Sequence, residues 1–361
     1  MAKKKTRKKI SLIDIIILLL ILVGLGVLIY PFASDAYVSY QNQKLIDSYQ
    51  SMETKKNTSA LKAEYKKYQR RNEELAKENP TPGISTFNNA VNAQGTANVK
   101  AKRKQKTLNR ETIAQLTIPK IKVSLPVFSK TTDWLLQFGA CLLDGTSYPT
   151  GGKGTHAVIS AHRGVPNAEL FTRLPELKKG DKFYIKIGNK TLAYQVYKRK
   201  TIKPSNVSAL RVEPGKDIVT LMTCTPYMIN SHRLLITGRR VPYTAKDDQA
   251  SKQSELWNKL KLVFWSVVAL LILGLIFLLG RSLTIGHRHY LLKAPANAAA
   301  MTAKRGRHDY TFESNDQGII SQELPGGRYQ VNVQLTTGQK RRYKAYVKHM
   351  GDQDFTLKLR R

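Results

Sequence analysis

The sequence predicts a mainly β protein: a closed barrel of about eight strands, preceded by helices and flanked by two transmembrane helices. Two observations support this prediction. Residues 111–245 contain many short runs of β-branched and apolar residues, separated by turn residues and interrupted by few helical patterns. On either side lies an apolar stretch, at residues 10–32 and 260–280, long enough to cross about 30 Å of hydrocarbon.

The charges beside the apolar stretches predict a two-pass membrane protein with both termini in the cytoplasm. Residues 1–9 contain six lysines and arginines, and Arg281, Arg288 and Lys293 follow the second stretch. The positive-inside rule places both groups on the cytoplasmic side, so the region between the spans lies outside the cell. A cleaved signal peptide ending near residues 32–36 is the alternative for the first stretch, but its long apolar run favours a retained anchor.

The net charge of +35 raises the question of whether the protein binds nucleic acid. The sequence contains no zinc-ligand cluster, aromatic RNA-binding strand or helix-turn-helix pattern to accompany that charge. We therefore expect no nucleic-acid partner. The histidines also lack the paired spacing of a zinc site, so we expect no metal and no cofactor.

The segments around the barrel are predicted from their residue spacing. Residues 33–79 show helical spacing and form membrane-proximal helices, with a break at Asn57 that can cap the second half. Residues 80–110 are polar and rich in Asn, Ala, Gly and Lys, which predicts a loop. In the cytoplasmic tail, residues 281–361, we expect a flexible tether at 294–307 and a small unit of three strands. Those three strands are predicted at residues 328–335, 341–347 and 354–359.

One of the two cysteines has the setting of a nucleophile. Cys224 follows the apolar run of residues 218–222, and Arg233 precedes the next strand, residues 234–237. A nearby cation lowers the pKa of a thiol and so increases the supply of thiolate. The alternative is a buried core cysteine and a solvated arginine. A disulfide with Cys141 would consume this thiol, so we expect both cysteines to be free.

Two segments resemble the active site of sortases, the membrane-anchored cysteine transpeptidases of Gram-positive cell surfaces. Residues 220–227 read Thr-Leu-Met-Thr-Cys-Thr-Pro-Tyr, and residues 230–234 read Asn-Ser-His-Arg-Leu. The Cys-Thr-Pro-Tyr part is most similar to class C, the pilus-assembling sortases. Residues 162–164, His-Arg-Gly, resemble the segment that carries their catalytic histidine. The resemblance covers about 116–241 and implies a sortase-type barrel with His162, Cys224 and Arg233 as catalytic residues.

The resemblance implies a transpeptidation. The Cys224 thiolate would attack the Thr–Gly bond of a Leu-Pro-x-Thr-Gly (LPXTG) sorting signal and form a thioacyl enzyme. Arg233 would stabilise the oxyanion or hold the substrate, and His162 would protonate the leaving amine. Thr223 and Thr225 are candidates for substrate contact, although ordinary strand positions also explain them. The acceptor would be an amine, such as a pilin lysine.

Two other functions remain as alternatives. A housekeeping sortase would join surface proteins to a peptidoglycan cross-bridge, and a non-catalytic basic membrane protein would bind anionic wall polymers. Class C sortases commonly carry a lid over the cysteine, anchored by an Asp-Pro-aromatic motif. Residues 80–110 contain no such motif. We therefore expect this segment to be mobile and Cys224 to be accessible.

Overall fold

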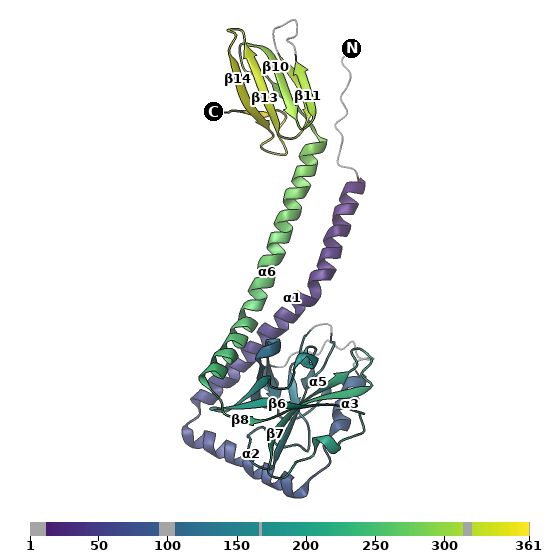
Figure 1. Cartoon of the computed structure of the whole chain (residues 1–361), viewed down its shortest axis with the longest axis vertical. Helices are drawn as coiled ribbons and strands as arrows, with labels where there is room; N and C mark the ends of the chain where they lie inside the picture. The colour runs from purple at the N-terminus through teal and green to yellow at the C-terminus, as the bar shows by residue number, and fades with distance from the viewer. Residues whose placement is uncertain (1–11, 94–104, 166–167, 313–319, 361) are drawn as a thin grey trace. The chain divides into compact units, whose positions relative to one another are not determined.

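The structure is a computed structural model of the chain, and it describes residues 12–93, 105–165, 168–312 and 320–360 (Figure 1). The chain divides into two compact units. The barrel unit is Val27–Val267, and the second unit combines Met1–Gly26 with Val268–Arg361. The predicted basic N-terminus, residues 1–9, lies outside the described residues.

The barrel unit contains a closed barrel of eight strands in the order β1-β2-β3-β4-β7-β8-β6-β5. Pairing of β1 with β5 closes the barrel, which confirms the predicted fold class. Most neighbouring strands are antiparallel, but β2–β3 and β4–β7 are parallel pairs. The strands are β1 (Thr112–Ile118), β2 (Val123–Phe128), β3 (Ala140–Leu142), β4 (Thr155–Ser160), β5 (Lys182–Ile187), β6 (Lys190–Ile202), β7 (Asp217–Thr225) and β8 (His232–Val241).

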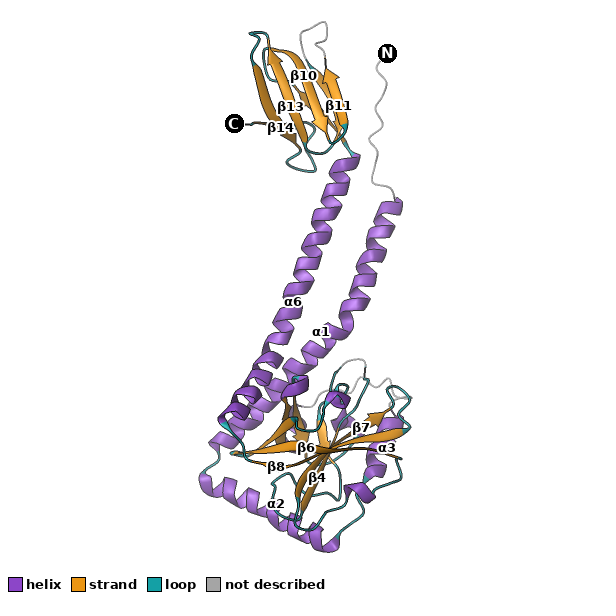
Figure 2. Cartoon of the chain, viewed as in Figure 1, coloured by secondary structure: helices purple, strands orange, loops and turns teal. Residues whose placement is uncertain are grey.

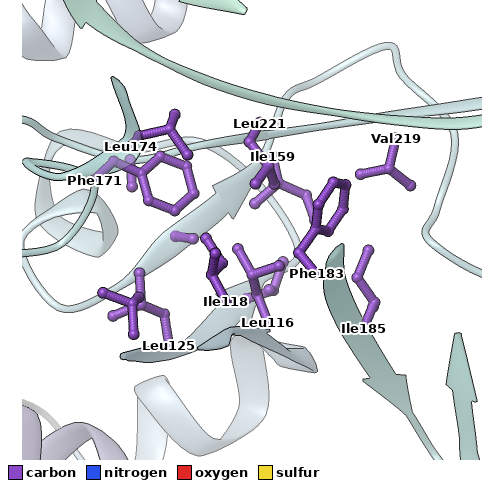
Figure 3. Packing of buried hydrophobic residues seen from close by; sticks show 14 of the residues in the cluster. Leu116, Ile118, Leu125, Ile159, Phe171, Leu174, Phe183, Ile185, Val219 and Leu221 are labelled. Atoms are coloured by element: carbon purple, nitrogen blue, oxygen red, sulfur yellow. The ribbon is translucent and has the colours of Figure 1, made fainter. Parts of the chain in front are cut away.

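The barrel is filled by the apolar residues whose runs predicted the strands. Figure 3 shows side chains of β1, β2, β4, β5 and β7 packing together inside it, with Phe171 and Leu174 from the segment after β4. Burial of apolar surface supplies most of the driving force for such a core. The labelled residues are Leu116, Ile118, Leu125, Ile159, Phe171, Leu174, Phe183, Ile185, Val219 and Leu221.

Two helices lead into the barrel unit. Helix α1 (Leu12–Lys55) is followed by α2 (Thr58–Glu78), and the side chain of Asn57 accepts a hydrogen bond from the Ala60 amide at the start of α2. This is the cap that the sequence predicted. Helix α2 packs beside the β3–β4 connection, where Asn72 donates to the Thr150 hydroxyl at 2.9 Å.

Helices α1 and α6 (Ala245–His287) are both anchored on the barrel by buried polar groups. The Tyr49 hydroxyl of α1 donates to the Ile113 carbonyl at 2.7 Å. Asp247, near the start of α6, accepts from the Tyr184 hydroxyl at 2.9 Å and pairs with Lys182 at 3.0 Å. By length and composition, both helices are apolar enough to cross a membrane.

The prediction of a loop at residues 80–110 is wrong for the part that the structure describes. Helix α3 (Ile84–Ala93) and helix α4 (Gln105–Glu111) occupy it, and residues 94–104 lie outside the described residues (Figure 2). Four apolar residues at helical spacing explain α3, because they give an otherwise polar segment one buried face. These residues are Ile84, Phe87, Ala90 and Val91. A short helix, α5 (Asp133–Leu136), packs beside α3.

The second unit ends in β-structure that is larger than predicted. Its main sheet has the order β11-β10-β13-β14-β15, and β9 pairs with β12. The predicted tether at residues 294–307 is wrong, because β10 lies between two other strands there. Its buried positions are Met301 and Ala303, and small alanines hid the alternation in the sequence. The strands are β9 (His289–Lys293), β10 (Ala298–Arg305), β11 (His308–Phe312), β12 (Ser321–Pro325), β13 (Tyr329–Leu335), β14 (Lys340–Tyr346) and β15 (Thr356–Leu359).

Candidate active site

The parallel pair β4 and β7 brings His162 and Cys224 to the same edge of the barrel. The last pair in their register joins Ser160 to Met222, so each candidate residue lies two positions beyond it. The connection continues past the strand end, because the Thr223 hydroxyl donates to the Ala161 carbonyl at 2.8 Å. Parallel neighbours end at the same edge, which explains how residues 62 positions apart come together.

Arg233 reaches the same place from the other side of β7. It lies opposite Cys224 in the antiparallel register of β7 and β8. Its guanidinium is held by the carbonyl oxygens of Asn230, at 2.7 Å, and His232, at 3.0 Å. The three residues that the sequence singled out are therefore neighbours on three adjacent strand ends.

Helix α3 lies over this group. The Phe87 ring lies 6.4 Å from the His162 ring, and the Arg233 guanidinium lies 5.6 Å from the centre of the same phenyl ring. Asn88 accepts hydrogen bonds from Arg233 Nε at 3.0 Å and Nη2 at 2.7 Å. The exposed fractions that result are 2% for Cys224, 1% for His162 and 2% for Arg233. The prediction of an accessible cysteine is therefore wrong for this structure.

Burial under α3 favours the neutral forms of both candidate residues, His162 and Cys224. Desolvation lowers the pKa of His162 to about 4. Desolvation also raises the pKa of the Cys224 thiol, although Arg233 and Arg163 act in the opposite direction. His162 Nε2 is buried and has no hydrogen-bond partner among the described residues. The covered site thus contains a thiol and a neutral imidazole, whereas the nucleophilic form of a cysteine is the thiolate.

The two threonines beside Cys224 have different surroundings. Thr223 is fully buried, and its hydroxyl is used in the bond to Ala161. Thr225 is partly exposed, and its hydroxyl accepts from Arg163 Nη1 at 3.4 Å. Of the two, Thr225 is the better placed to meet a substrate.

A second buried histidine of the barrel unit, His156, has structural partners. His156 contacts the Arg211 carbonyl and the Thr220 hydroxyl, each at 2.7 Å. Both cysteines are free thiols, and burial raises the pKa of Cys141. Among the described residues, no three His, Cys, Asp or Glu side chains gather as metal ligands.

Sequence reasoning missed two residues that contact the site, Phe87 and Asn88. The signal that could have found them is the apolar spacing of Ile84, Phe87 and Val91, which is that of a helix with one buried face. No signal in the sequence alone indicates that Asn88 meets Arg233, because the two residues are 145 positions apart.

Comparison with known proteins places the barrel in a family. Residues 116–241 match the sortase domain family. Sortase A of Bacillus anthracis is 30% identical over 137 residues, which are 38% of this chain and 63% of that protein. Sortase A of Streptococcus agalactiae is 30% identical over 123 residues, which are 33% of this chain and 49% of that protein. The chain thus spans 63% of the first of these relatives and 49% of the second, which is less than two thirds of either.

Among solved structures, sortase C-1 of Streptococcus pneumoniae is 39% identical, with a TM-score of 0.47 and coverage of 56% of this chain and all of that one. Sortase C1 of Streptococcus agalactiae is 36% identical, with a TM-score of 0.47 and coverage of 55% and 98%. The domain match spans β1 to β8, and it contains all three residues gathered under α3. The barrel of this chain, residues 116–241, is a sortase domain.

Proposed function

We propose that this protein is a cysteine transpeptidase that cleaves an LPXTG-type sorting signal and transfers the acyl group to an amine. The observation that carries the proposal is the meeting of His162, Cys224 and Arg233 at neighbouring strand ends. The Cys224 thiolate attacks the Thr carbonyl and forms a thioester, and the peptide bond to Gly breaks. His162 gives its proton to the leaving amine and later takes one from the incoming amine.

Arg233 stabilises the negative charge that develops in this reaction. Its guanidinium lies beside Cys224 and offers several N–H donors in a fixed plane, which suits a tetrahedral oxyanion. Two of its nitrogens, Nε and Nη2, donate to Asn88 while α3 is in place. Binding of a sorting signal therefore requires α3 to move away and release these donors.

We assign the acceptor amine to a pilin lysine. The Cys-Thr-Pro-Tyr segment, the second apolar helix α6 and a covering helix α3 all favour the pilus-type reaction. The housekeeping alternative uses a peptidoglycan cross-bridge amine instead. In either case, helices α1 and α6 cross the membrane, the barrel unit lies outside the cell, and both termini lie in the cytoplasm.

The test is incubation of the full chain with sorting-motif peptides and a lysine-containing or cross-bridge amine. We expect a covalent adduct on Cys224, detected by mass spectrometry, and its loss in Cys224→Ala. In His162→Ala the barrel should remain folded while product formation stops. A protein that only binds anionic polymers would keep its binding in Cys224→Ala, and unchanged peptide turnover in that variant would exclude the proposed nucleophile.

A further inference from the structure

The residue after the candidate histidine, Arg163, connects the loop that carries His162 with the end of strand β7, which carries Cys224. Its Nη1 atom donates to the Cys224 carbonyl at 3.3 Å and to the Thr225 hydroxyl at 3.4 Å. Its Nε atom donates to the Thr172 carbonyl at 3.3 Å. One guanidinium therefore joins the loop after β4, the end of β7 and the turn at Thr172.

An aromatic ring reinforces this connection. The Arg163 guanidinium lies 5.5 Å from the centre of the Tyr227 ring, a distance that allows a cation–π contact. Tyr227 also lies against Gly164, whose φ of +77° belongs to the left-handed region. A Cβ atom on Gly164 would come within 2.9 Å of the tyrosine ring. Glycine is required there by both the backbone angle and the close approach.

Arg163 also contributes positive charge to the thiol. Both Arg233 and Arg163 lower the pKa of Cys224, against the effect of burial. The two arginines differ in their relation to α3: Arg233 donates to Asn88, whereas the hydrogen bonds of Arg163 run to Thr172, Cys224 and Thr225. The contribution of Arg163 therefore does not depend on the position of α3.

We propose that Arg163 is a positioning residue of the transpeptidation, which holds the backbone of Cys224 at a fixed place beside the His162 loop and supplies a second positive charge to the thiolate. This inference rests on the proposed function for its role in turnover. Planar N–H groups that point to separate acceptors are a property of arginine, and the compact ammonium of lysine cannot reproduce them. Loss of alignment between a nucleophile and its proton donor lowers a rate even when both groups remain.

The experiment separates the effect of the positive charge of Arg163 from the effect of its planar N–H donors. The full chain is studied in detergent with two background substitutions. Cys141→Ala leaves Cys224 as the single thiol, and Phe87→Ala makes Cys224 equally accessible in every variant. The pH at which iodoacetamide alkylation is half-maximal is then compared for Arg163→Gln, Arg163→Lys and the parent. Arg71→Gln is the matched control, since Arg71 is exposed on α2 and pairs with Glu74.

We expect Arg163→Gln to raise the alkylation midpoint by about half a pH unit to one unit, because one cation is lost beside the thiolate. In Arg163→Lys the midpoint should stay near the parent value, while kcat for peptide cleavage falls by about tenfold to a hundredfold. The control should change neither quantity. If Arg163→Gln does not fold, the test is Arg163→Lys alone: an unchanged alkylation midpoint together with a lowered kcat supports the inference.

An unchanged midpoint in folded Arg163→Gln, or full activity in Arg163→Lys, would overturn the inference. The alkylation readout needs no sorting signal. A shifted midpoint in a protein that cleaves none of the peptides would therefore count against the proposed function while leaving the electrostatic role of Arg163 in place.

Discussion

Replacement of Phe87 by alanine should uncover the active site. The phenyl ring is fully buried and lies close to both His162 and Arg233, so its loss removes an apolar contact of α3 with the site. Truncation of a buried phenylalanine costs about 3–5 kcal/mol. Since about 1.4 kcal/mol is a factor of ten, even the lower figure raises the population with α3 displaced by about a hundredfold.

The assay is the rate of Cys224 alkylation at pH 7.5 in the full chain carrying Cys141→Ala. We expect an increase of about a hundredfold in Phe87→Ala. Asn88→Ala should give a smaller increase, about tenfold, because water replaces the lost hydrogen bonds to Arg233 once the site opens. Asn89→Ala is the matched control: the residue is the next asparagine of α3, and it is exposed.

Alkylation of Phe87→Ala within twofold of the parent, with an unchanged thermal midpoint, would refute this account of α3. The site would then open by a movement that the Phe87 contacts do not restrain. Faster alkylation of Asn89→Ala as well would instead indicate general loosening of the helix.

Three further predictions concern the reacting groups. Arg233→Lys should lose most transpeptidase activity, because an ammonium cannot reproduce the planar donors; near-normal product formation would reduce its role to simple charge. Cys141→Ala should keep activity and lower stability by about 1 kcal/mol, measured by thermal unfolding; a Cys141–Cys224 disulfide found by non-reducing mass spectrometry would contradict this. The pKa of His162 is about 4 under α3 and returns toward about 6.5 in water. Protonation therefore favours the open form as the pH falls below about 6.5, and amide exchange of α3 should show more than tenfold more opening at pH 5 than at pH 7. Exchange that is independent of pH, after correction for the intrinsic rate, would exclude this link.

The barrel could be predicted, and the three candidate residues could be singled out, because their signals are local. Short β-branched runs mark the strands, and Cys224 and His162 each follow such a run. Their proximity required the parallel pairing of β4 with β7, which no local pattern reveals but which the resemblance to sortases supplied. Asn57 was predictable for a similar reason, since a cap acts within its own turn.

The covering helix was not predicted because its stability comes from contacts far away in the sequence. Residues 80–110 have a polar average composition, and four apolar positions are enough to dock α3 when a barrel is there to receive them. Strand β10 shows the same effect. Its alanines have weak strand propensity, and pairing with β11 and β13 decides its conformation.

Burial of the Cys224 sulfur beneath α3 has a consequence for the lifetime of the protein. Peroxide and disulfides react with exposed thiolates, and the covered sulfur is neither exposed nor ionised. On the proposed extracellular side of the membrane no reducing pool restores an oxidised cysteine, so every interval with α3 displaced would expose the Cys224 thiol to irreversible damage. Helix α3 would therefore protect the Cys224 sulfur from oxidation while it blocks the substrate. The variants whose Cys224 is alkylated fastest should also be the first to be inactivated in air.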